Sequence, residues 1–193
     1  MEIKTDTPNF LTYCFVISVI FLLRISDLLI TFHYTPDLSF EFNPVVSVFG
    51  ASWSSFILIQ LILFVFLSFI ISFYFFADKN RIEKAGLSFF DFIHFYFHGE
   101  LRPLHARFSL YPRNIRRHLS FNGFLFMVLS IGVSVYAVVH NLLLINRINW
   151  YEFLIIQHHK VIFSLLLVVA VIITSLTYFL IEYSNYKKNQ ICN

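Results

Sequence analysis

A short, strongly aromatic stretch of the chain contains a carboxylate and two imidazoles at helical spacing. Asp91, His94 and His98 recur at intervals of three and four residues, which would place them on one face of an α-helix. Side chains of these types can share a divalent metal ion, and His105 could add a further ligand. The same stripe is typical of the water-facing side of an amphipathic helix. We favour this second interpretation and expect no metal, no cofactor and no catalytic residue.

Polar side chains also occur within long apolar stretches. Arg24 and Asp27 lie three residues apart, so on a helix they would share one face and could form an ion pair. Gln60 and Asn141 are amides in two further apolar stretches. Ionisable groups within a membrane are costly and usually face a partner, a cavity or water. Such groups could form part of an ion pathway, but we favour a self-neutralised pair that fixes helix packing or an oligomer interface.

A basic segment follows the aromatic stretch. Its arginines are candidates for binding anionic lipid head groups, at about 1 kcal/mol per residue near the membrane surface, or a soluble protein partner. The excess of Lys and Arg that is general in cytoplasmic loops would explain them without any specific ligand. We expect no direct contact with nucleic acid, because the segment is short and strongly aromatic. These arginines are Arg102, Arg107, Arg113, Arg116 and Arg117.

The elements that must position these residues are membrane spans. The chain is 58% hydrophobic and 13% charged, whereas a soluble domain carries about 25% charged residues. Four apolar stretches, residues 10–32, 53–76, 124–145 and 161–181, reach the roughly 20 residues that a helix needs to cross the hydrocarbon core. Backbone polar groups in lipid must be satisfied within each segment, which favours helices. We therefore expect an all-α polytopic membrane protein, a four-helix bundle that forms one domain over residues 1–193.

The distribution of positive charge predicts the orientation of the chain. All but three of its 14 Lys and Arg residues fall on one side of the spans; the exceptions are Arg24, Arg147 and Lys160. Both termini and the loop 77–121 should therefore be cytoplasmic. Residues 86–97 within this loop are mostly apolar, but they are too few to cross the membrane. We expect an amphipathic cytoplasmic helix there, between the second and third spans, along the inner leaflet or under the bundle.

Two resemblances to known proteins add expectations. The pattern Asp27-x-x-x-Thr31…Glu41-x-Asn43-Pro44 resembles one in small uncharacterised prokaryotic membrane proteins, which brings no known activity. The size, the four-span plan and a composition rich in Phe and poor in Gly look like those of the membrane subunit of the Kiwa anti-phage defence system. That resemblance implies a tetrameric sensor in a bacterial inner membrane that works with a soluble cytoplasmic protein.

The predicted function is therefore a non-enzymatic, oligomeric membrane sensor or scaffold. Small and polar residues on one face of the third span, among them Ser130, Ser134 and Asn141, predict contacts within the bundle or self-association. The chain contains no nucleotide-binding, serine-hydrolase or zinc-protease motif. The alternatives are a small ion channel or transporter that uses Arg24 and Asp27, and a membrane metalloenzyme built on the histidine stripe.

Overall fold

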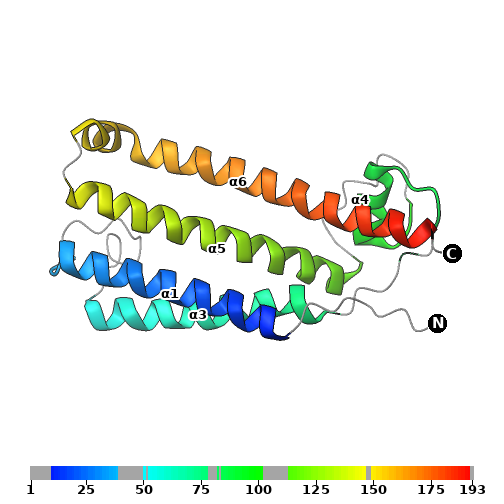
Figure 1. Ribbon diagram of the computed structural model, residues 1–193, viewed down its shortest axis with the longest axis horizontal. Coiled ribbons are helices and arrows are strands. Elements are labelled where there is room, and N and C mark those ends of the chain that lie inside the picture. Colours follow the sequence, from blue (N-terminus) through cyan, green and yellow to red (C-terminus); the bar gives the residue numbers. More distant parts are fainter. Residues whose placement is uncertain are drawn as a thin grey trace.

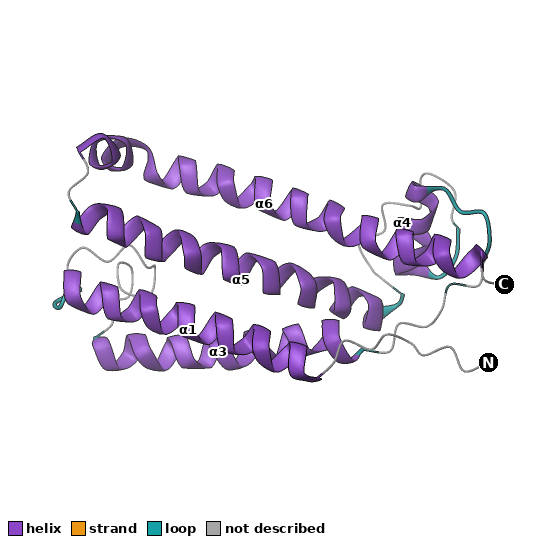
Figure 2. Cartoon of the chain, in the orientation of Figure 1, coloured by secondary structure: helices purple, strands orange, loops and turns teal. Residues whose placement is uncertain are grey.

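Nearly all of the described chain is helical. The computed structural model describes residues 10–38, 50, 52–77, 82, 84–101, 113–146 and 149–191. These ranges contain no strand (Figure 2), so the predicted all-α class is confirmed. The helices are α1 (Phe10–Tyr34), α3 (Trp53–Phe76), α4 (Phe89–His98), α5 (Ile115–Ile145) and α6 (Asn149–Ile191).

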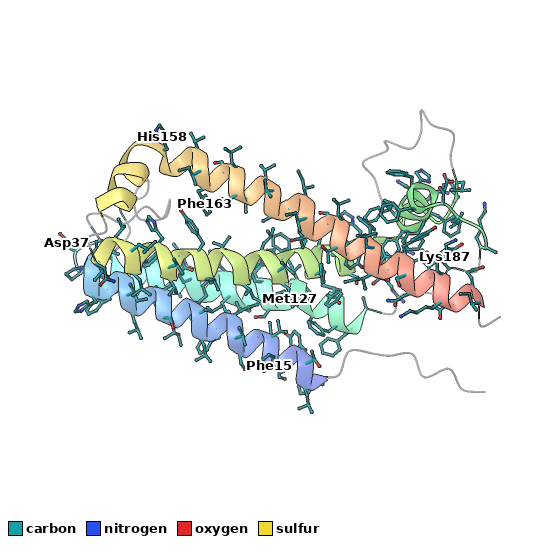
Figure 3. The ribbon with its side chains drawn as sticks, turned by 45° about the horizontal axis from the view of Figure 1, so that its top comes forward. Phe15, Asp37, Met127, His158, Phe163 and Lys187 are labelled. Carbon is teal, nitrogen blue, oxygen red and sulfur yellow. The ribbon has the colours of Figure 1, made fainter. Side chains whose placement is uncertain are left out.

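Four of these helices are long and apolar enough to cross a membrane. The spans run over Phe10–His33, Trp53–Phe76, Ile115–Ile145 and Val161–Ile191. Their outer surfaces carry large apolar side chains: Phe15 of α1 is 68% exposed and points away from the bundle in Figure 3, and Leu165 of α6 is 61% exposed. A contiguous apolar surface of this kind is stable against lipid but not against water. The chain is therefore an integral membrane protein.

Helix α5 occupies the middle of the bundle. Figure 1 shows α1 and α3 on one side of it and α6 on the other, and α5 packs more extensively against α3 and α1 than against α6. The first turns of α6, gold in Figure 1, run in a different direction from the rest of that helix. The beginning of α1, the end of α6 and helix α4 lie at the same end of the bundle.

Two helices approach each other closely at a glycine of α5. A Cβ atom built on Gly123 would lie 2.7 Å from the backbone oxygen of Ile70 and 2.9 Å from the backbone nitrogen of Tyr74, both in α3. Only glycine therefore allows α5 and α3 to pack this closely, as small residues do in other membrane bundles. A Cβ atom on Gly132, farther along α5, would meet no atom within 4 Å.

Both ends of α4 are set by local hydrogen bonds. The Ser88 hydroxyl oxygen accepts a hydrogen bond from the backbone N–H of Asp91 at 3.2 Å, and the hydroxyl donates to Asp91 Oδ2 at 2.7 Å. Gly99 closes the helix with φ of 73°, and its N–H donates to the carbonyl oxygen of Phe95. This combination of an N-terminal Ser cap and a left-handed C-terminal Gly limits α4 to ten residues.

Two helices extend beyond the apolar stretches seen in the sequence. The predicted second span coincides with α3, but α5 begins at Ile115 instead of residue 124, and α6 continues to Ile191 instead of ending at residue 181. These two extensions contact α4, whose position under the bundle was one of the two predicted alternatives. We call this assembly of α4, residues 115–124 of α5 and residues 178–191 of α6 the α4 end.

Candidate functional site

A buried aromatic core holds the α4 end together. It joins side chains of all three helices and of the segment that precedes α4. Many of its rings meet edge to face, an arrangement that adds about 0.5–1.5 kcal/mol per pair to the burial of apolar area. The fully buried members are Leu87, Phe92, Tyr96, Phe124, Tyr178, Phe179 and Tyr186. The α4 end is therefore packed like the core of a soluble domain.

Two tyrosines of α6 bind the backbone of the segment that precedes α4. The Tyr186 hydroxyl donates to the carbonyl oxygen of Lys84 at 2.8 Å and accepts from the N–H of Leu87 at 3.1 Å. The Tyr183 hydroxyl donates to the carbonyl oxygen of Leu87 at 3.1 Å. Buried backbone groups that lack such partners are costly. The two side chains therefore fix where α4 starts relative to the last membrane span.

A second chain of hydroxyl groups connects all three helices. The hydroxyls of Tyr96 in α4 and Tyr178 in α6 lie 2.7 Å apart, and the Tyr178 hydroxyl donates to Ser120 Oγ in α5 at 3.3 Å. The three side chains are at most 2% exposed. Burial raises the pKa of Tyr96 above its ordinary value near 10, and the neighbouring Tyr178 and Glu182 raise it further. This hydroxyl is therefore neutral at physiological pH, which suits a structural link.

Arg117 belongs to this core and not to the protein surface. Its side chain is 5% exposed, Nη1 donates to the carbonyl oxygen of Tyr96 at 3.3 Å, and the guanidinium carbon lies 5.2 Å from the centre of the Tyr96 ring. The sequence prediction that Arg117 binds lipid or a partner is thus wrong. The first turn of α5 directs this arginine inward against α4, where a cation lies over an aromatic face.

The other predicted basic residues have different surroundings. Arg113 donates from Nη1 to Glu100 Oε1 at 3.1 Å, and both side chains are largely exposed, so this ion pair contributes little to stability. Arg116 is exposed on the first turn of α5. Arg102 and Arg107 lie outside the described residues. Among the described residues, Arg113 and Arg116 are the predicted basic residues that the structure places at the surface. Phe90, in the first turn of α4, is 76% exposed.

The histidine stripe of α4 is buried instead of facing water. His94 is 7% exposed and His98 is 8% exposed, and their rings lie with centroids 4.8 Å apart at an angle of 34°. The interpretation of this stripe as the wet face of an amphipathic helix is therefore wrong. Asp91 takes part in the cap of α4, and His105 lies outside the described residues. Among the described residues, no group of three or more His, Cys, Asp and Glu side chains is placed to hold a metal ion.

Within the spans, Asp27 has its hydrogen-bond partner on a different helix, whereas the sequence predicted a pair with Arg24 of its own helix. Asn141 Nδ2 of α5 donates to Asp27 Oδ1 of α1 at 3.1 Å and to Thr31 Oγ1 at 3.4 Å. Arg24, Asp27 and Thr31 are all among the described residues, and no ion pair joins Arg24 to Asp27. Gln60 of α3 is half-buried and takes no part in this contact. Asp27, Thr31 and Asn141 thus tie α1 to α5 across the bundle, in place of the self-neutralised pair of Arg24 and Asp27 that the sequence predicted.

The small residues of α5 also face the bundle. Ser130 is 6% exposed and Ser134 is completely buried, and the Ser134 hydroxyl donates to the carbonyl oxygen of Ser130 at 2.7 Å. Of the two roles predicted for this face, the structure therefore shows contact within the bundle. Buried serines of this kind allow α1 and α3 to approach α5 closely.

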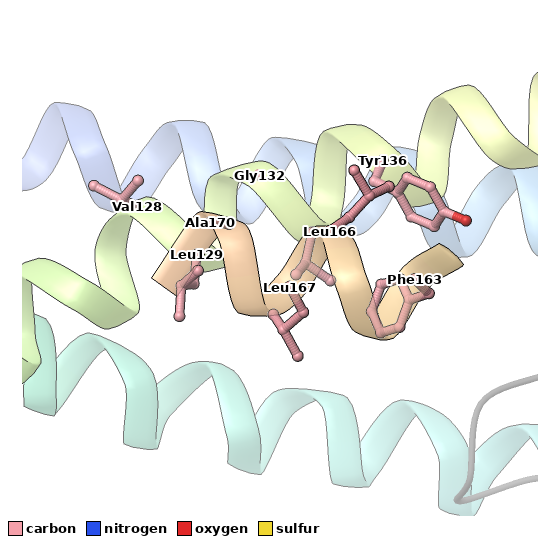
Figure 4. Close-up of a pocket in the computed structure, with 9 residues that line it drawn as sticks. Val128, Leu129, Gly132, Tyr136, Phe163, Leu166, Leu167 and Ala170 are labelled. Atoms are coloured by element: carbon pink, nitrogen blue, oxygen red, sulfur yellow. The ribbon is translucent and has the colours of Figure 1, made fainter. Parts of the chain in front are cut away.

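An apolar pocket of about 300 Å³ separates part of α5 from α6 (Figure 4). Its lining is almost entirely hydrocarbon, with the Tyr136 side chain as its polar member. Sites for polar substrates carry several convergent polar groups, and this pocket does not. It includes Leu129, Gly132 and Tyr136 of α5 and Phe163, Leu167 and Ala170 of α6.

The tyrosines and Gly123 were not singled out from the sequence. Tyr183 and Tyr186 lie three residues apart beyond the predicted fourth span, and this helical spacing was a signal for them, whereas Tyr178 lies within that span. In comparisons with known proteins, no family model, no curated protein and no solved structure matches the chain. The fold and the site define the class of this protein, an integral membrane helical bundle with an extra helix packed on one end.

Proposed function

We propose that this protein is a non-enzymatic membrane sensor or scaffold subunit that presents its α4 end to a soluble protein in the cytoplasm. The observation that carries the proposal is the rigid attachment of α4 to two membrane spans. Tyr96, Tyr178 and Ser120 join α4 to α6 and α5, so a displacement of either span moves α4 as well. Coupling between distant sites requires a connected packed element of this kind.

The distribution of charge supports a cytoplasmic position for the α4 end. Arg113, Arg116, Lys187 and Lys188 all lie there, and positively charged segments flanking spans stay in the cytoplasm. The exposed arginines would lie near the anionic head groups of the inner leaflet. Figure 3 places Lys187 at this end and Asp37 and His158 at the opposite end. A bacterial inner membrane, with both termini in the cytoplasm, is the location that we propose.

The resemblance to the membrane subunit of the Kiwa system extends this proposal. It supports a homo-oligomer, with four copies as the expectation, that acts in anti-phage defence. Phe90 on α4 is 76% exposed, and Arg113 and Arg116 are exposed at the same end of the bundle. These side chains support a protein partner, because aromatic and Arg side chains are enriched at protein interfaces.

Site-specific photo-crosslinking in cells, followed by native mass spectrometry of the gently extracted complex, tests this function. A crosslinker at Phe90 should capture a soluble protein and one at Leu165, on the lipid-facing surface of α6, should not. Arg116→Glu should reduce the yield of the Phe90 crosslink without reducing the amount of protein in the membrane. A bare monomer in the mass spectrum, together with equal yields at the two positions, would contradict the proposal.

A further inference from the structure

His94 is an isolated polar group inside the α4 end. Its side chain is 7% exposed, and neither Nδ1 nor Nε2 has a hydrogen-bond partner among the residues that the structure describes. A neutral imidazole has one N–H that donates and one nitrogen that accepts a hydrogen bond. Leaving a buried polar atom without a partner costs about 1–3 kcal/mol. The aromatic core that explains Tyr96 and Arg117 does not supply a partner for these two nitrogens.

His98 lies one helical turn away and brings a second imidazole to the same place. The two residues are four apart, so their side chains project from the same face of α4, and their ring centroids are 4.8 Å apart. Both rings are more than nine-tenths buried. Two nitrogens bound to one tetrahedral zinc ion lie roughly 3.3 Å apart, given zinc–nitrogen bonds of about 2.0–2.1 Å. Two histidines four residues apart on one face of a helix can bind the same zinc ion.

We propose that His94 and His98 form a binding site for a divalent transition-metal ion that favours imidazole ligands, such as Zn²⁺ or Cu²⁺. Bound metal would supply the partner that His94 lacks, and it would stabilise α4 by joining two successive turns. Two protein ligands leave coordination positions for water or for a donor from a partner protein. The site is thus suited to regulation by metal or to metal-dependent docking, independently of the function proposed above.

Metal binding by His94 and His98 can be tested directly on the full-length protein in lipid nanodiscs, with any affinity tag removed. Zn²⁺ titrated by calorimetry should bind with one equivalent per chain. His94→Gln and His98→Gln should each weaken Zn²⁺ binding by more than about tenfold. Removing a residue that only hydrogen-bonds to a metal ligand already lowers metal affinity by about tenfold or more, and removing a ligand itself should lower it further. His118→Gln is the matched control, because His118 lies at the same end of the bundle beside Phe97 and outside the pair.

A spectroscopic measurement on the unaltered protein keeps the test valid if a variant fails to fold. Pulsed electron paramagnetic resonance of bound Cu²⁺ should show two coordinated imidazoles. Affinity should also fall as the pH is lowered, because imidazole binds metal only in its neutral form. No binding of Zn²⁺ by the folded protein, a Cu²⁺ spectrum with one imidazole or none, or equal affinities for the three variants would overturn the proposal.

Discussion

The hydroxyl groups of Tyr96 and Tyr178 lie 2.7 Å apart in the interior of the protein, and this contact joins the short helix α4 to the last membrane span. Tyr178 also donates to Ser120, so one side chain links three helices. The apolar rings around these hydroxyls exclude water, and a hydrogen bond in such surroundings has no competing partner. The α4 end and the spans should therefore unfold together.

The first prediction concerns this pair of tyrosines. Tyr178→Phe preserves the ring but leaves the Tyr96 hydroxyl without its neighbour, so we expect a loss of about 1–3 kcal/mol in the free energy of unfolding. Tyr96→Phe should cost a similar amount, and the double variant should cost less than the sum of the two. A double-mutant cycle in detergent micelles, measured by reversible denaturation, gives the coupling energy. A coupling energy near zero would show that the two hydroxyls act independently.

The second prediction separates two neighbouring arginines. Arg117→Ala removes a buried cation from the Tyr96 carbonyl and ring, and it should lower the free energy of unfolding by about 1–3 kcal/mol. Arg116→Ala alters an exposed side chain and should change stability by no more than about 0.5 kcal/mol. Thermal unfolding of the two purified variants, followed by size-exclusion fluorescence, measures the difference. Equal effects would place Arg117 at the surface, as the sequence alone suggested.

The third prediction uses two glycines of α5. Gly123→Ala forces a methyl group to within 3 Å of the α3 backbone, and overpacking of this kind costs about 1–3 kcal/mol. Gly132→Ala adds a methyl group in open space and should be neutral or slightly stabilising, since Ala favours helix more than Gly. The midpoints of thermal unfolding provide the comparison. If both variants behave alike, α3 and α5 do not approach at Gly123.

The fourth prediction distinguishes packing from ion conduction at Asp27. Asp27→Asn keeps an acceptor oxygen for Asn141 and should preserve the fold, whereas Asp27→Ala breaks the link between α1 and α5. Hydrogen bonds between membrane helices average about 0.6 kcal/mol, so the loss should be modest. Ion flux into liposomes should be at background for the unaltered protein and for both variants. Flux that is present and disappears in Asp27→Asn would favour the channel.

Length and composition were enough to predict the membrane spans. Twenty or more apolar residues in a row can be stable only in lipid, and in lipid they must be helical, so Trp53–Phe76 could be located without knowing its neighbours. The existence of a helix in the 77–121 loop was also predictable, because its polar residues repeat at helical intervals, although its polar stripe is not the side that faces water. Its ends moved by a few residues, since the caps at Ser88 and Gly99 act locally.

The partners of individual side chains were decided by the tertiary structure. Helical periodicity showed that His94 and His98 share a face with each other, but the sequence does not say which face of a short helix is covered. The same is true of Arg117, which turns inward because α4 packs against the first turn of α5. Asp27 pairs with Asn141, more than a hundred residues away, because the bundle brings α1 beside α5. Local sequence determined which segments are helices, while contacts between distant segments determined which residues each helix buries.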